Sequence, residues 1–173
     1  MKKIATAFIA TLLLSSTLSF GAVAQTAAVG TDKDDKSKYI DAKGEPIYKK
    51  FDDGSFDWYT FNGFRRYHAE CHVCHGPEGK GSTYAPALAD SLKTMGYGDF
   101  VGVVASGRIV ELSGGAKSVM PALGDNKNVM CYIDDIFVYL KARAEGALPG
   151  GRPKREVERS QASQDYENSC LKG

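Results

Sequence analysis

The stretch Cys71-His72-Val73-Cys74-His75 decides how the rest of the chain is organised. It follows the Cys-x-x-Cys-His pattern by which c-type haem is attached. On one helical turn, Cys71, Cys74 and His75 lie three and four residues apart and project from the same face. Two thiols can then bond the edge of a porphyrin while the imidazole reaches its iron. We therefore predict one covalently bound haem c, with His75 as the proximal iron ligand.

Two other kinds of site also use Cys-x-x-Cys. A zinc site needs a second pair of ligands. A thiol redox motif belongs with a βαβ pattern, which this sequence lacks. Both alternatives fit the stretch less well than haem does.

The first 24 residues have the pattern of a secretory signal peptide. Lys2 and Lys3 precede an apolar stretch at 4–20, and Ala22-Val23-Ala24 supplies a small-x-small cleavage site. An uncleaved membrane anchor is the alternative, but serines and threonines interrupt the stretch and it is shorter than the ~20 apolar residues of a span. We predict a periplasmic protein with no membrane span after cleavage. Loss of two lysines leaves a net charge near zero, which argues against wholesale nucleic-acid binding.

The mature chain divides into three predicted parts. Residues 25–57 form an N-terminal extension that lacks periodicity up to residue 38 and then indicates a small β-hairpin, because turn sequences occupy 42–44 and 52–54. Residues 58–146 are predicted to form the domain that holds the haem. Residues 147–173 are charged and poor in apolar side chains, and we expect a flexible tail there.

The central domain is predicted to be all-α. Its first helix is expected to begin at a Thr60 cap and to run to the haem motif. Two short helices follow at 90–95 and at 99–107, and a polar loop follows at 111–117. A longer last helix, capped by Asn126 or Asn128, carries an apolar stripe and closes near residue 146.

Cys131 and Cys170 remain once the other two cysteines are assigned to haem. An even remainder in an oxidising compartment makes a disulfide plausible. The alternative is two free thiols, with Cys131 acting as a small buried apolar residue.

The iron ligand opposite His75 decides whether the haem carries electrons or reacts with small molecules. Met120 lies between predicted elements, and Pro121 stiffens the chain directly after it. Four other donors are available in the mature chain: Met95, Met130, His68 and His72. The two methionines fall on predicted helices, where Met more often fills the core. His72 lies within the attachment motif beside Cys71, and His68 lies one turn before it, so neither is expected to reach the opposite face of the haem. Met120 is therefore the predicted distal ligand, and six ligands in both oxidation states favour electron transfer.

Two further residues are candidates for contacts around the haem. The carbonyl of Pro86 could accept a hydrogen bond from the second ring nitrogen of His75 and fix the ring's orientation. Arg108 could pair with a haem propionate, or it could be an ordinary solvated arginine.

These residues together resemble class I cytochromes c over about 58–146. Gly63, Tyr67 and Cys71 recur at four-residue intervals on the first helix, and Ile136 and Tyr139 look like the partner positions on the last helix. Pro86 and the pair Met120-Pro121 fit the haem-ligand loops of that family.

Three segments carry a closer likeness: Tyr59-Thr60-Phe61-Asn62-Gly63-Phe64-Arg65-Arg66-Tyr67-His68, Asp90-Ser91-Leu92-Lys93-Thr94-Met95 and Asn128-Val129-Met130-Cys131-Tyr132-Ile133-Asp134-Asp135-Ile136. They resemble the periplasmic cytochromes of methylotrophic bacteria that serve quinoprotein methanol dehydrogenases, especially the lanthanide-dependent ones. The resemblance implies single-electron transfer from a pyrroloquinoline quinone (PQQ) dependent dehydrogenase towards a smaller cytochrome c and a terminal oxidase.

Three functions compete at this point. An electron carrier without a substrate pocket would dock transiently through an exposed haem edge, over an interface below about 1,200 Å². A peroxidase or gas sensor would need a displaceable sixth ligand in place of Met120. A haem subunit permanently attached to a dehydrogenase would need a partly exposed apolar stripe on the last helix.

Overall fold

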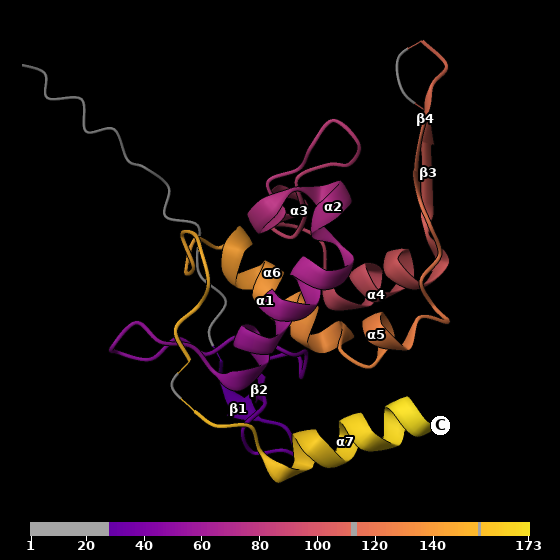
Figure 1. Ribbon diagram of the computed structural model, residues 1–173. Helices are drawn as coiled ribbons and strands as arrows, with labels where there is room; N and C mark the ends of the chain where they lie inside the picture. Colours follow the sequence, from indigo (N-terminus) through magenta and orange to yellow (C-terminus); the bar gives the residue numbers. More distant parts are fainter. Residues whose placement is uncertain (1–27, 112–113, 156) are drawn as a thin grey trace, which may run out of the picture.

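The computed structural model describes residues 28–111, 114–155 and 157–173 (Figure 1). The predicted signal peptide, 1–24, lies outside these residues. Helices α1 (Trp58–Glu70) and α6 (Ile133–Ala144) pack against each other at the centre. Shorter helical elements surround them: α2 (His72–His75), η1 (Pro77–Gly79), α3 (Leu88–Ser91), α4 (Tyr97–Ser106) and α5 (Lys127–Met130). Two antiparallel strand pairs and a C-terminal helix complete the fold.

The first strand pair joins β1 (Gly30–Thr31) to β2 (Tyr39–Ile40), and the second joins β3 (Arg108–Glu111) to β4 (Lys117–Met120). Helix α7 (Gln161–Lys172) ends the chain. Within the described residues, every helix is too short or too polar to cross a membrane.

Helices α1 and α6 approach so closely at Gly63 that no side chain fits between them. A Cβ atom on Gly63 would lie 1.8 Å from the backbone oxygen of Asp135 and 2.8 Å from Cβ of Tyr139. One turn further along α1, the ring of Tyr67 packs on that of Tyr139, with 5.4 Å between centroids, and both side chains are fully buried. The helix contact predicted from Gly63, Tyr67 and Tyr139 is confirmed.

The N-cap of helix α1 lies three residues before the predicted Thr60 cap. The N-cap is Asp57, whose carboxylate accepts hydrogen bonds from the backbone N–H of Thr60 (3.0 Å) and from its hydroxyl (2.7 Å). An Asp side chain at the N-cap satisfies backbone donors that the first helical turn leaves free. Asp57 is almost fully buried, so this cap also anchors the start of α1 inside the protein.

The predicted last helix is two helices. Asn126 caps α5: its side chain accepts a hydrogen bond from the backbone N–H of Asn128 (2.9 Å). Of the two caps predicted from the sequence, Asn126 and Asn128, the structure has Asn126. The backbone of Tyr132 then leaves the helical region, with φ −131° and ψ 20°, and α6 starts at Ile133. Asp134 and Asp135 occupy the first turn of α6, where carboxylates interact favourably with the helix dipole.

The predicted hairpin before the first helix is present. The turn-forming sequences do form turns, since the backbone N–H of Gly44 donates to Asp41 and that of Gly54 donates to Phe51. Strand β2 lies where the hairpin was expected to start, but β1 lies earlier, within 25–38, where the sequence lacks periodicity. Its pairing with β2 depends on backbone hydrogen bonds, which side-chain periodicity does not report.

The C-terminal region corrects the expectation of a flexible tail. Ser160 caps α7 by accepting from the backbone N–H of Ser163 (3.0 Å), and a disulfide joins Cys170 to Cys131 at the end of α5. The preceding segment pairs with the N-terminal extension, since the backbone N–H of Phe56 donates to the carbonyl of Lys154 (2.7 Å). Residues about a hundred positions apart thus form one surface layer, with α7 along the lower edge in Figure 1.

We expect Gly63→Ala to destabilise the protein by about 3 kcal/mol, because the added methyl group forces α1 and α6 apart in an otherwise close-packed core. Gly98→Ala is the matched control: it adds the same methyl group to helix α4, where nothing lies within 4 Å of the new Cβ. That control should gain about 0.5–1 kcal/mol through helix propensity. Urea unfolding followed by circular dichroism measures both, and equal stabilities would contradict the close contact.

Candidate functional site

The turn that carries Cys71, Cys74 and His75 lies at the junction of α1 and α2. The backbone N–H of Cys71 donates to Tyr67 (2.9 Å), and that of His75 donates to Cys71 (3.0 Å), so the helical turn predicted from the motif is present. The two thiols are not bonded to each other. Burial raises the pKa of Cys71 to about 12, and a thiol that stays neutral is a poor redox nucleophile.

His75 is buried and oriented by one hydrogen bond. Its side chain is 6% exposed, and Nδ1 lies 3.0 Å from the carbonyl oxygen of Pro86. A carbonyl can only accept, so the proton is on Nδ1 and the lone pair is on Nε2. An imidazole in this tautomer, held by a backbone acceptor, is the usual form of a histidine that binds a metal.

The glycine-rich loop after His75 is fixed to the two central helices. The hydroxyl of Tyr67 donates to the carbonyl of Gly76 (2.5 Å). Gly76 has φ 74°, and a Cβ there would lie 2.2 Å from the backbone oxygen of Gly81. Position 76 therefore requires glycine for two reasons: the backbone has a positive φ, and the backbone of Gly81 leaves no room for a side chain.

Arg143 of α6 holds the middle of the same loop. Its guanidinium donates to the carbonyl of Glu78 (3.2 Å), to the carboxylate of Glu78 (3.1 Å) and to the carbonyl of Leu148 (2.6 Å). A hydrogen bond from Lys80 and another from the backbone of Gly151 lower the pKa of Glu78 to about 2, with Arg143 adding to the effect. The loop beside His75 is thus tied to the last core helix by a charged pair.

Met120 lies at the end of β4, on a hairpin that sequence reasoning missed. The 111–117 segment was expected to be a loop, but its ends are strands: Met120 pairs with Arg108, and Val119 pairs with Ile109. Figure 1 shows this β3–β4 hairpin projecting from the helical body. Met120 itself is partly buried and packs against the core.

One glycine contact and two backbone hydrogen bonds fix the base of this hairpin. Gly107, which ends α4 as predicted, has φ 72°, and a Cβ there would lie 2.6 Å from the carbonyl oxygen of Met120. The backbone N–H of Leu123 donates to Val104 (3.0 Å), and that of Gly124 donates to Ala105 (3.1 Å). The Met120-Pro121 segment is therefore held against the end of α4.

We call the turn at 71–75 the attachment turn. A short chain of hydrogen bonds links it to β4. Ser82 donates through its hydroxyl to the carbonyl of Cys74 (2.5 Å) and accepts from the backbone N–H of Tyr84 (3.0 Å). The hydroxyl of Ser118 then donates to the carbonyl of Tyr84 (3.0 Å). The strand that carries Met120 thus lies beside the loop that leads to Pro86.

Arg108 is exposed on β3, directly opposite Met120. This position places its guanidinium at the same strand pair as the predicted iron ligand. Its proposed contact with a propionate remains a prediction.

The other candidate ligands point elsewhere. His68 donates from Nδ1 to the carbonyl of Phe64 (2.8 Å), and His72 donates in the same way to His68 (2.9 Å), so both rings bond the backbone of their own helical segment. Met130 is the last residue of α5. Met95 follows α3, outside the helix predicted for it, and lines an open trough between α3 and α4.

The residues present fit a covalently held haem. Two thiols lie on one helical turn, a buried imidazole offers Nε2, and a thioether lies on a strand tied to the same loop. Among the described residues, no three His, Cys, Asp or Glu side chains gather as metal ligands, so the zinc alternative lacks its second pair.

Comparison with known proteins agrees with this donor set. No protein-family model matches the chain. Cytochrome c-553I of Paracoccus denitrificans is 52% identical over 142 residues, which span 82% of this chain and 62% of that relative. Cytochrome c-555 of Methylococcus capsulatus is 38% identical over 96 residues, which span 55% of this chain and 71% of that relative. The chain belongs to the c-type cytochromes.

The fold comparison supports the same family. The crystal structure of the c-type cytochrome XoxG from Methylobacterium extorquens AM1 matches with a TM-score of 0.73 and 50% identity, covering 82% of this chain and 86% of that one. The predicted class I cytochrome c fold is therefore confirmed, as is the assignment to electron carriers rather than enzymes. Membership of the family also implies covalently bound haem c.

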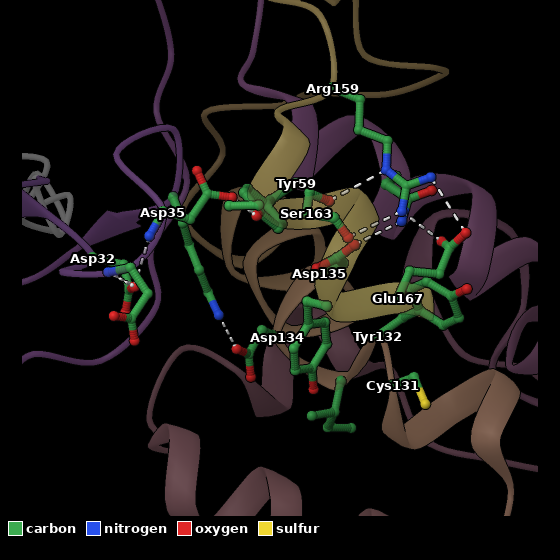
Figure 2. A pocket seen from close by; sticks show the side chains of 16 residues that line it. Asp32, Asp35, Tyr59, Cys131, Tyr132, Asp134, Asp135, Arg159, Ser163 and Glu167 are labelled. Atoms are coloured by element: carbon green, nitrogen blue, oxygen red, sulfur yellow. Dashed lines mark hydrogen bonds and ion pairs between the residues drawn. The ribbon is translucent and has the colours of Figure 1, made fainter. Parts of the chain in front are cut away.

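A partly enclosed cavity lies away from the turn that carries Cys71, Cys74 and His75. It has a volume of ≈ 240 Å³ and lies between the N-terminal extension, α6 and α7 (Figure 2). Its polar groups bond one another: Lys38 pairs with Asp134, Ser160 donates to Asp35 (2.7 Å), and Asn62 donates to Asp135. This cluster ties the two ends of the chain to α6.

Asp135 is the most deeply buried carboxyl of that cluster. Its side chain is 6% exposed and accepts a hydrogen bond from Asn62 (2.6 Å). Burial raises its pKa from 3.8 to about 7; the hydrogen bond opposes this shift and the neighbouring Asp134 adds to it. The folded cytochrome therefore retains a proton that the unfolded chain releases at lower pH.

We expect Asp135→Asn to remove a pH dependence of stability. Between pH 3.8 and about 7 the folded state binds more protons at this site than the unfolded state does, so its contribution to stability falls as the pH rises. The variant keeps an acceptor for Asn62 but no charge, so its stability relative to the parent should increase across that window and stay level above it. Urea unfolding at a series of pH values measures the difference in the free energy of unfolding between variant and parent. If that difference does not change with pH, Asp135 does not retain a proton in the folded state.

Proposed function

We propose that the protein is a periplasmic monohaem cytochrome c that accepts single electrons from a PQQ-dependent methanol dehydrogenase. It passes them towards a smaller cytochrome c and a terminal oxidase. Cys71 and Cys74 attach the haem, and His75 and Met120 bind its iron.

The observation that carries this proposal is the orientation of His75. Its Nδ1–H is committed to Pro86, which leaves Nε2 as the ligand atom, and burial keeps the ring in that position. Met120 is supported as the second ligand because its strand is anchored to the 82–86 loop through Ser118. A thioether opposite an imidazole raises the reduction potential relative to two nitrogen ligands.

When bound, the haem supplies a one-electron iron couple. His75 and Met120 would hold the iron: Pro86 orients the His75 ring, while Gly107 and Pro121 hold the Met120 segment. Little rearrangement is then needed between oxidation states. Oxidation of the two-electron quinol in a dehydrogenase takes two molecules of the cytochrome, each gaining one electron, and releases two protons to solvent.

The proposal that the electron donor is a methanol dehydrogenase is supported by sequence similarity alone. The three quoted segments resemble cytochromes that serve methanol dehydrogenases, and XoxG is the structural relative that shares 50% of its sequence. A gas-binding haem protein with a displaceable sixth ligand is the second candidate; such a protein would have to release the methionine before it could bind a gas.

The absorption spectrum of the parent protein separates the two candidates, and replacing Met120 tests whether this residue is the ligand. We expect Met120→Ala to lose the weak far-red sulfur-to-iron absorption band, to become high-spin and to bind imidazole or carbon monoxide. Met95→Leu is the matched control and should keep the parent spectrum, because it removes a methionine that lines a different surface. A parent protein that already lacks the band and binds carbon monoxide would favour the second candidate.

The dehydrogenase assignment is tested by mixing. Purified oxidised cytochrome is combined with a PQQ-dependent methanol dehydrogenase and methanol, and haem absorbance is followed in a stopped-flow instrument. We expect two moles of cytochrome reduced per mole of methanol oxidised to formaldehyde. Reduction no faster than with bovine serum albumin in place of the dehydrogenase would reject the assignment.

A further inference from the structure

Exposed aliphatic side chains gather on the β3–β4 hairpin. Ile109 is 68% exposed, Val119 is 62% exposed and Val110 is 40% exposed. Ile109 and Val119 are direct cross-strand partners, so their side chains lie on the same face of the hairpin. This paired aliphatic surface is open to solvent and is therefore available for contact with another protein.

The alternation of the strands gives the hairpin two distinct faces. Met120 and Ser118 lie on one face, which is partly buried: Met120 packs on the core and Ser118 bonds Tyr84. Val119 and Lys117 lie on the other face and are exposed, and the burial of β4 alternates accordingly. We call this second surface the outer face; it comprises Ile109, Glu111, Lys117 and Val119.

The haem cannot cover the outer face. If Met120 binds iron, the porphyrin lies on the side of β4 to which Met120 projects. Ile109 and Val119 then project the opposite way, so their exposure persists in the haem-loaded protein. Glu111 stands opposite Lys117 across the strands, so the charges on the outer face balance and its attraction for a partner is chiefly apolar.

We infer that the outer face of the β3–β4 hairpin is the docking surface for the electron-donating dehydrogenase; the inference rests on the proposed function. Val119 is bonded directly to Met120, so a protein seated on Val119 lies close to an iron ligand. Electron-transfer rates fall steeply with distance, so contact here favours rapid transfer.

The size of the surface distinguishes a transient partner from a second copy of the chain. A stable dimer needs about 800 Å² from each partner. The outer face offers two aliphatic side chains and one balanced charge pair, which is far below that area. A brief encounter with a redox partner requires less surface and must release quickly.

The test compares two variants of the full-length haem-loaded protein. Ile109→Thr with Val119→Thr keeps β-branched residues in both strands and removes apolar surface. Val29→Thr makes the same kind of change at a site that is 65% exposed, outside the hairpin. For the hairpin variant we expect about a tenfold increase in the cytochrome concentration that half-saturates reduction by the dehydrogenase, from the lost apolar contact. Surface plasmon resonance should show a matching loss of affinity.

Further measurements distinguish a loss of docking in the hairpin variant from damage to its haem site. The hairpin variant should keep the parent's absorption spectrum, reduction potential and rate of reduction by ascorbate, and its defect should persist at high salt because the outer face carries no net charge. If the cytochrome concentration that half-saturates reduction of the hairpin variant is within twofold of the parent's, the inference is overturned while the proposed function stays intact. Parent protein that the dehydrogenase does not reduce would overturn both. Concentration-dependent dimerisation in the ultracentrifuge that the hairpin variant abolishes would assign the face to a second copy and overturn the inference.

Discussion

The contact between α1 and α6 at Gly63 determines where the attachment turn lies. Because no side chain separates the helices there, the α1 axis is fixed against α6, and Cys71 follows two turns after that contact. Helix α6 then holds the chain on the far side of His75 as well, through Arg143 and Glu78. The position of His75, the proposed proximal ligand, therefore depends on a single helix pair acting at two points.

The two sides of the site are joined by short polar contacts as well as by the core. Ser82 bonds the attachment turn, and Ser118 bonds the same loop from β4. Neutral hydrogen bonds of this kind contribute about 1 kcal/mol each, so they stabilise little but fix direction. In this protein, apolar packing provides the stability and backbone carbonyls provide the orientation, with Pro86 as the clearest case.

Local signals were sufficient for much of the fold and the proximal side of the site. The helical turn at 71–75, the end of α4 at Gly107 and the Pro86 contact all depend on residues close in sequence or on spacing along one helix. The β3–β4 hairpin also had a local signal, since β-branched residues flank Gly114 and Gly115, both of which have positive φ. That signal was outweighed by the polar composition of the segment between the strands.

Other features had no local signal. Helix α7 is poor in apolar residues, and what stabilises it lies elsewhere in the chain: the disulfide to Cys131 and the bonds from Ser160 and Lys154 to the N-terminal extension. The break at Tyr132 likewise interrupts a pattern that is helical on both sides. Composition and periodicity report on residues that are near one another in the sequence. The contacts that stabilise α7 join residues that are distant in the sequence.

The pairing of the two chain ends has a consequence for the order of folding. The extension at 28–57 precedes the central helices in the chain, yet its partners, from Lys154 to Ser163 and α7, follow them. Domains generally fold as units, but this surface layer cannot close until both segments are available. Helices α1 and α6 lie between the two segments in the sequence, so they can pack against each other before the surface layer closes.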